Sequence, residues 1–159
     1  MQETSYKTDT LGEDLHKQIR TELRIAFGSI PFMSILMTPF PVLVAKGYSK
    51  VYHNVDDYGW GYLLFSIPLF LFCTDMAIYF IHRGLHLPFL YRYIHKPHHT
   101  YRFTTPYSSH AFHPIDGWAQ GVPYYVFPFF FPLHSGLFIV MFMFVNLWTI
   151  SVRTTDSQI

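Results

Sequence analysis

The stretch GWGYLLFSIPLFLFCTDMAIYFI, from Gly59 to Ile81, is the clearest indication of the fold class in this sequence. Its 23 residues contain a single charged side chain, Asp75. Crossing the hydrocarbon layer of a membrane takes about 20 predominantly apolar residues, so this stretch predicts a transmembrane helix. The segment Ile25–Ala45, 21 residues without a charge, predicts another.

The overall composition agrees with a membrane protein. Half of the 159 residues are hydrophobic and 13% are charged, whereas soluble domains carry about 25% charged residues. A net charge of +1 gives no electrostatic footprint for nucleic acid, which we therefore exclude as a partner. We predict that the chain has three segments: a polar N-terminal segment (1–24), a membrane-embedded domain (25–152) and a divergent C-terminal tail (153–159).

A third apolar region, residues 121–150, has no formal charge over 30 residues. It is too long for one straight crossing, and the sequence from Phe131 to Gly136 contains a proline and a glycine that break it. The halves Gly121–Phe131 and Leu137–Ile150 are each short for a full span. We predict a helical hairpin or re-entrant pair; a single kinked, tilted helix is the alternative.

The predicted fold is thus an all-α integral membrane protein. It has two full transmembrane helices, the hairpin or re-entrant pair, and a cytosolic histidine-rich helical region. The orientation comes from the positive-inside rule: four Lys or Arg precede the first span, two lie between the spans, and four lie in residues 82–120.

Five of the ten histidines lie in residues 82–99. His82 and His86 are four residues apart, so on a continuous helix they project from one face and can grip one metal ion. Pro88 favours a new, amphipathic helix over residues 89–94. His95 would then end that helix, and His98 and His99 would come from the next turn. The sequence predicts a metal site with these five ligands.

Three further residues have open roles. Asp75 is an ionisable group within a span, and we interpret it as an acceptor for a ligand histidine N–H; an acid near the membrane interface is the alternative. His110 and His113 are either ligands, hydrogen-bond donors behind the ligands or pocket residues, or they belong to helix-cap and turn chemistry. Imidazole alone leaves the metal open among iron, zinc, copper and nickel. The remaining histidines, His16, His53 and His134, are predicted to be structural or on the surface.

Several of these motifs resemble the membrane fatty acid hydroxylase and sterol desaturase superfamily, and within it the C5 sterol desaturases, or lathosterol oxidases. The most specific stretches are HKPHH (residues 95–99) and SHAFHPIDG (residues 109–117). The other matching stretches are residues 47–50, 74–76, 78–79, 81–86, 131–134 and 146–151.

The resemblance implies an enzyme of the endoplasmic reticulum membrane whose histidine boxes face the cytosol and bind two non-haem irons that activate O₂. His82 and His86 match the first box, and His95, His98 and His99 match the second. Electrons would come from NAD(P)H through cytochrome b5 and its reductase. The reaction would introduce a C5–C6 double bond into a Δ7-sterol. Six aromatic residues are candidates for the sterol slot: Phe80, Phe89, Tyr93, Phe103, Phe112 and Trp118.

The chain departs from the family after residue 151, where no histidine follows. Family members carry a third box there, and two irons need about eight or more protein ligands. We therefore expect an incomplete site with a single, weakly held metal. The corresponding hypothesis is a C5 sterol desaturase chain truncated at both ends, inactive alone or dependent on partner chains.

Two alternatives from other classes remain. One is a membrane metal-binding or transport protein, although transporters usually place polar ligands near the bilayer midplane. The other is a non-catalytic modulator that assembles with a full-length homologous subunit.

Overall fold

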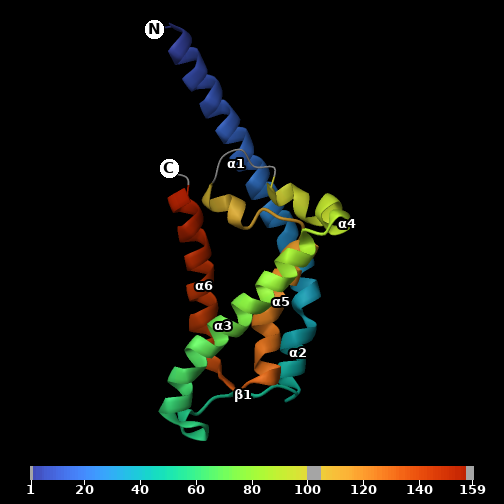
Figure 1. The fold of residues 1–159 in the computed structure, drawn as a ribbon, viewed down its shortest axis with the longest axis vertical. Coiled ribbons are helices and arrows are strands. Elements are labelled where there is room, and N and C mark those ends of the chain that lie inside the picture. The colour runs from blue at the N-terminus through green and yellow to red at the C-terminus, as the bar shows by residue number, and fades with distance from the viewer. Residues whose placement is uncertain (1, 100–104, 157–159) are drawn as a thin grey trace.

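The computed structural model describes residues 2–99 and 105–156, and it is almost entirely helical (Figure 1). This confirms the predicted fold class. The long elements are α1 (Gln2–Met37), α3 (Gly59–Leu85), α5 (Pro114–Phe130) and α6 (Ser135–Asp156). The short helices are α2 (Pro39–Ala45), η1 (Val55–Asp57), α4 (Pro88–Leu90), η2 (Tyr91–His95), η3 (Lys96–His99) and η4 (Pro106–Ser109). Two short strands, β1 (Val51–Tyr52) and β2 (Leu133–His134), pair in parallel.

Within the described residues, two helices are long and apolar enough to cross a membrane, α3 and the segment Ser135–Val152 of α6. Only 17% and 6% of their most apolar windows are buried inside the protein. Large apolar side chains therefore point outward along both helices, which suits a lipid surround and would be unfavourable in water. This confirms the transmembrane helix predicted from residue 59 onward.

The first predicted span, Ile25–Ala45, is not one helix. The structure breaks it at Thr38, and α1 and α2 meet at a bend of 40°. Pro39 begins α2; it has no N–H to donate to the carbonyl of Ile35, and its ring clashes with that carbonyl, which kinks a helix although Thr38 itself keeps helical backbone angles. The bent pair is long and apolar enough to count as a third span only when both helices are taken together.

The predicted hairpin is confirmed, with longer arms than expected. Helix α5 ends at Phe130 and α6 begins at Ser135, so the break falls within the predicted segment. Because α5 begins at Pro114 and α6 extends to Asp156, the prediction that both arms are short was wrong for α6, which is a candidate span by itself. The hairpin returns the end of α6 to the level at which α5 begins (Figure 1).

Small residues bring α1 and α5 together. Gly117 and Gly121 are one helical turn apart on α5, opposite Met33 and Met37 of α1. A Cβ at Gly117 would lie 2.5 Å from Met33 Sδ, and one at Gly121 would lie 2.7 Å from Met37 Cε. Small residues at this spacing allow helices in a membrane to approach closely. The close approach is strictest at Gly117, where a Cβ would also meet the ring of Phe112, whereas at Gly121 it would meet only the flexible end of Met37.

An aromatic core joins α3, α5 and α6 below that contact. Its buried residues are Phe70, Phe127, Leu133 and Met141. Phe70 and Phe127 pack edge to face with their ring centroids 5.1 Å apart, a favoured arrangement for aromatic pairs. This core fixes the hairpin against the middle of α3.

The paired strands β1 and β2, called the strand junction below, lie at one end of the molecule (Figure 1). Two histidines are part of it. His53 Nδ1 lies 2.9 Å from Ser135 Oγ, and His134 Nε2 donates to the carbonyl oxygen of His53 over 2.9 Å. The other ring nitrogen of His134 accepts from Leu137 N at 3.4 Å. Both histidines therefore hold the turn between α5 and α6.

Candidate metal centre

The histidine region forms at the far end of α3 from the strand junction. His82 lies in the last turn of α3, and His86 is the residue that caps it. Leu87 has extended backbone and Pro88 begins α4, as expected for a residue that precedes proline. The predicted helix over residues 89–94 is observed as two short pieces, α4 followed by the wider π-helical turn η2, which ends at His95. Such π-helical turns are frequent at functional sites.

Four histidines converge in space. One ring nitrogen from each of His82, His86, His95 and His99 lies within 4.8 Å of the others. The Nε2 atoms of His82 and His95 are 2.9 Å apart, those of His95 and His99 are 2.9 Å apart, and those of His82 and His86 are 3.3 Å apart.

These separations suit shared binding of a cation. Two imidazole nitrogens bound to one ion at about 2.1 Å lie roughly 3.0 Å apart at a right angle and roughly 3.4 Å apart at the tetrahedral angle. The observed distances of 2.9–3.3 Å are close to this range. The arrangement therefore fits a transition-metal ion with small adjustments of the side chains.

The cluster is buried on one side and open on the other. His95 is fully buried and His82 is half-buried, whereas His86 and His99 are exposed. A bound ion would thus be anchored from within the protein and reached from outside. Three exposed cationic residues, Arg83, Arg92 and Lys96, lie in the same segment of the chain.

A buried carboxylate supports the cluster from behind. Asp116 Oδ2 lies 2.7 Å from His95 Nδ1, and neither side chain is exposed to solvent. Gln120 Nε2 donates to the other carboxylate oxygen of Asp116 over 2.6 Å. When His95 Nδ1–H donates to Asp116, Nε2 keeps its lone pair and faces the cluster. Asp116 also lies in the first turn of α5, where the helix dipole favours a negative charge.

Asp75 does not have the role that the sequence analysis gave it. It is exposed, and none of the described histidine side chains hydrogen bonds to it. It lies seven residues before His82, about 10 Å along the helix axis at 1.5 Å per residue. The carboxylate that accepts from a cluster histidine is Asp116. Asp116 is part of the SHAFHPIDG motif, residues 109–117, but no role for it was predicted from the sequence.

The other candidate residues fall in different places. His113 caps α5, where its Nδ1 accepts from Ile115 N at 3.3 Å, so the helix-cap alternative describes it. His110 lines a cavity beside Phe112 and is not one of the four convergent histidines. The side chain of His98 lies outside the described part of the structure.

A second buried carboxylate ties α1 to the loop that follows the cluster. Glu22 is fully buried, and Thr105 Oγ1 donates to its Oε2. Gln18 Nε2 donates to the other oxygen over 2.6 Å. Thr105 in turn caps η4 by accepting from Ser108 N at 3.2 Å. This contact fixes η4 beside α1 and was not predicted.

The model of the fatty acid hydroxylase family matches residues 67–156, which include the whole histidine cluster, Asp116 and Gln120. The chain belongs to the fatty acid hydroxylase family. Enzymes of this family are oxygen-dependent and typically use iron. The four convergent histidines provide a donor set that suits such a metal.

Among curated relatives, the chain is 45% identical over 147 residues to the lathosterol oxidase of Rattus norvegicus and 44% identical to that of Homo sapiens. Each alignment covers 91% of this chain and 49% of the relative. A Delta(7)-sterol 5(6)-desaturase of Aspergillus fumigatus is 48% identical over 140 residues, with 87% of this chain and 40% of the relative covered. The chain therefore spans about half the length of these relatives or less. No solved structure matches it.

Proposed function

We propose that this fatty acid hydroxylase family member is a sterol C5-desaturase-type oxidoreductase. One hydrogen would leave C5 and one would leave C6 of a Δ7-sterol. O₂ would be reduced to two waters with two electrons and two protons supplied from outside the sterol. The observation that carries the proposal is the histidine cluster backed by Asp116, in a chain 44–48% identical to lathosterol oxidases and Δ7-sterol 5(6)-desaturases.

His82, His86, His95 and His99 would hold iron, with His98 as a proposed fifth ligand. Bound iron would supply the oxidising power to remove hydrogen from an unactivated carbon, which no protein side chain can do. Four imidazoles fill most of the shell of one ion. The second iron expected from the family resemblance would need ligands beyond these four.

Residues around the cluster have supporting roles. Asp116 would hold the His95 tautomer, and Gln120 would hold Asp116 by its hydrogen bond of 2.6 Å. Substitution of such hydrogen-bond partners of metal ligands typically lowers metal affinity or activity 10- to 100-fold. They act on the orientation of the ligand and do not contact the substrate.

We further propose that the cluster lies at the cytosolic face of the endoplasmic reticulum membrane. The cluster lies where α3 ends, so a sterol dissolved in the bilayer could reach it from the side. The exposed residues Arg83, Arg92 and Lys96 would attract an acidic redox partner. We propose cytochrome b5, reduced by its reductase, as that partner. Ligands at the end of a helix, away from the bilayer midplane, do not favour a transporter.

Expression in a yeast strain without its own Δ7-sterol 5(6)-desaturase tests this function. Gas chromatography with mass spectrometry would measure conversion of the accumulated Δ7-sterol to the 5,7-diene. Diene from the parent chain and none from His82→Ala, at equal membrane abundance, would support the proposal and would contradict the expectation that the chain is inactive alone. The control His134→Ala should retain activity. Absence of diene from cells whose membranes contain the parent chain would contradict the proposal.

A further inference from the structure

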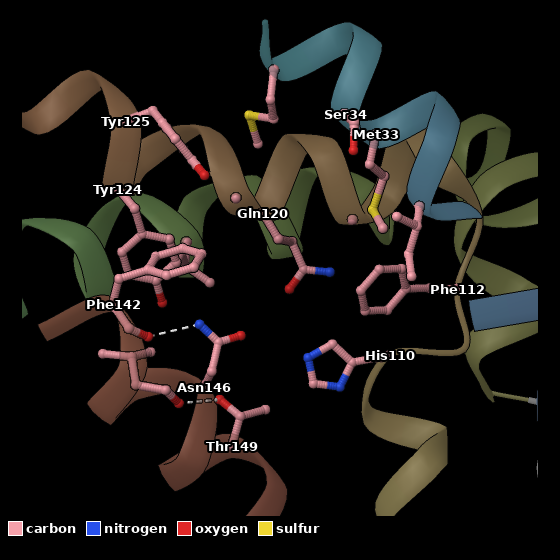
Figure 2. A pocket seen from close by; sticks show the side chains of 16 residues that line it. Met33, Ser34, His110, Phe112, Gln120, Tyr124, Tyr125, Phe142, Asn146 and Thr149 are labelled. Carbon is pink, nitrogen blue, oxygen red and sulfur yellow. Dashed lines mark hydrogen bonds between the residues drawn. The ribbon is translucent and has the colours of Figure 1, made fainter. Parts of the chain in front are cut away.

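A mostly apolar cavity of about 430 Å³ lies between α1, α5 and α6, with Ile78 of α3 in its wall (Figure 2). Met33, Tyr124, Tyr125 and Phe142 contribute much of its apolar surface. Small-molecule sites in proteins typically have volumes of about 300–1,000 Å³ and apolar walls with a few polar groups. The cavity thus has the size and lining of a ligand site.

The cavity continues toward α3. A second cavity, of about 450 Å³, shares Ile78, Tyr124, Val145 and Thr149 with the first. The two cavities therefore adjoin each other, and the second also has Asp75 in its wall. The mostly apolar lining of the first cavity suits an apolar ligand better than a charged one.

Two carboxamides present oxygen atoms to the first cavity. Gln120 donates its amide nitrogen to Asp116, and Asn146 donates its amide nitrogen to the carbonyl oxygen of Phe142 over 2.7 Å. These bonds fix which end of each amide is the nitrogen, so Oε1 of Gln120 and Oδ1 of Asn146 are left to accept. Figure 2 shows the two amides projecting into the same space from α5 and α6. A ligand hydroxyl is the matching donor.

The polar side of the cavity adjoins the metal centre. Gln120, in the cavity wall, connects to His95 through Asp116 by two hydrogen bonds. On α3, Ile78 of the wall lies one helical turn before His82 of the cluster. In a sterol, C5 is two bonds from C3, the carbon that bears the hydroxyl. A sterol oxidised at C5 must therefore place its hydroxyl end toward the metal, and Gln120 is the cavity residue that is hydrogen-bonded, through Asp116, to a cluster histidine.

We propose that this cavity binds the sterol substrate and that the carboxamide oxygens of Gln120 and Asn146 recognise its 3-hydroxyl. The inference rests on the proposed function and assigns the specificity-determining residues of the same site. Of the aromatic residues predicted to form a sterol slot, Phe112 lines this cavity, whereas Phe80, Phe89 and Tyr93 are exposed. The slot is thus formed mainly by α1, α5 and α6.

Asn146 gives the direct test, because it lies outside the metal centre. Binding of radiolabelled lathosterol to the purified protein in detergent would be measured for the parent chain and for Asn146→Leu, which removes the acceptor at similar size. We expect the variant to bind about 3- to 10-fold more weakly, the loss of one net hydrogen bond. Competition by the 3-deoxy analogue, cholest-7-ene, should be equal for both proteins. Equal lathosterol affinity in the two proteins would overturn the role of Asn146.

A cavity-filling variant tests the location independently. Ser34 lines the cavity, whereas the neighbouring Ile35 does not and is 69% exposed. We expect Ser34→Trp to reduce lathosterol binding at least tenfold and the matched Ile35→Trp to leave it unchanged. Iron content and melting temperature should match the parent chain in both variants. Unchanged binding in Ser34→Trp would show that the sterol binds elsewhere.

These readouts separate the two proposals. Sterol binding that Ser34→Trp abolishes, in a chain that makes no diene, would support the cavity and contradict the desaturase function. Diene formation with an unchanged KM in Ser34→Trp would support the function and overturn the cavity.

Discussion

Histidines gather near both ends of α3, and the two groups differ in what their ring nitrogens face. At the strand junction, His53 and His134 direct their nitrogens to Ser135 Oγ, a backbone carbonyl and a backbone N–H. At the other end, four histidines direct one nitrogen each toward a common point. The number of histidines in a segment is therefore less informative than their partners. Nitrogens paired with the fold stabilise it, whereas nitrogens that face one another can share a cation.

The largest expected difference between the two ends is in metal affinity. His82→Ala removes a nitrogen from the convergent set, so we expect cobalt affinity, measured by absorbance titration, to fall by more than about 100-fold, beyond the effect of losing a supporting residue. His134→Ala removes a histidine that pairs with the fold and should bind cobalt as the parent chain does. Equal losses in the two variants would mean that the cluster is not the metal site.

The two aspartates sharpen the comparison within the cluster end. Asp116→Asn keeps the shape of the side chain but weakens the charged acceptor of His95, so metal affinity should fall about 10- to 100-fold. Asp75→Asn, on an exposed part of α3, should leave it unchanged. The same cobalt titration measures both. A larger loss in Asp75→Asn would restore the role that the sequence first suggested for Asp75.

The next largest expected effect is a loss of stability when the packing between helices α1 and α5 is disturbed. Gly117 follows Asp116, and a Cβ there would lie 2.1 Å from Phe112 Cε2 and 2.5 Å from Met33 Sδ. Gly117→Val should lower stability by about 1–3 kcal/mol through overpacking. It should also weaken metal binding, because α5 carries the aspartate. Gly61→Val, toward the other end of α3 where a Cβ meets nothing within 4 Å, is the matched control. Thermal unfolding in detergent compares them, and equal melting temperatures would contradict the packing account.

The smallest expected effect is a pH-dependent change in stability at the strand junction. The Tyr52 hydroxyl is buried, and no hydrogen-bond partner for it exists among the described residues. Burial raises the pKa of Tyr52 above its usual 10.0, helped by nearby Tyr58 and Asp57. The folded state thus favours the neutral phenol, so its contribution to stability is present below pH 10 and is lost as the pH rises through the folded-state pKa.

At pH 7, the free energy of unfolding of Tyr52→Phe should therefore lie within about 1 kcal/mol of that of the parent chain. Above pH 10 it should melt at a higher temperature than the parent. A parent chain that is clearly more stable at pH 7 would reveal a hydrogen bond to Tyr52.

Local spacing predicted much of this molecule. The apolar run from Gly59, with its single charged residue, predicted α3, the break after Phe131 predicted the hairpin, and the four-residue spacing of His82 and His86 predicted their shared face. The bend at Thr38 could also have been predicted from Pro39 and Pro41, because a proline in a helix removes a backbone hydrogen bond and its ring clashes with the carbonyl four residues earlier. These features depend on neighbours within one or two helical turns.

The missed features depend on packing between distant segments. Asp116 meets His95 across 21 residues, and Thr105 meets Glu22 across 83 residues. Both pairings require α1 and α5 to be in place, which no local pattern specifies. Asp75 was conspicuous as a charge within an apolar run, but its height along α3 places it below the cluster. A carboxylate beside a helix start, with Gln120 four residues later, was the available signal for Asp116.

X-ray absorption spectroscopy of the iron-loaded protein would show whether the convergent histidines bind the metal. We expect a shell of imidazole nitrogens from these four histidines, reduced in His82→Ala and unchanged in His134→Ala. An iron environment of oxygen ligands alone, or one that is identical in the parent chain and His82→Ala, would contradict this expectation.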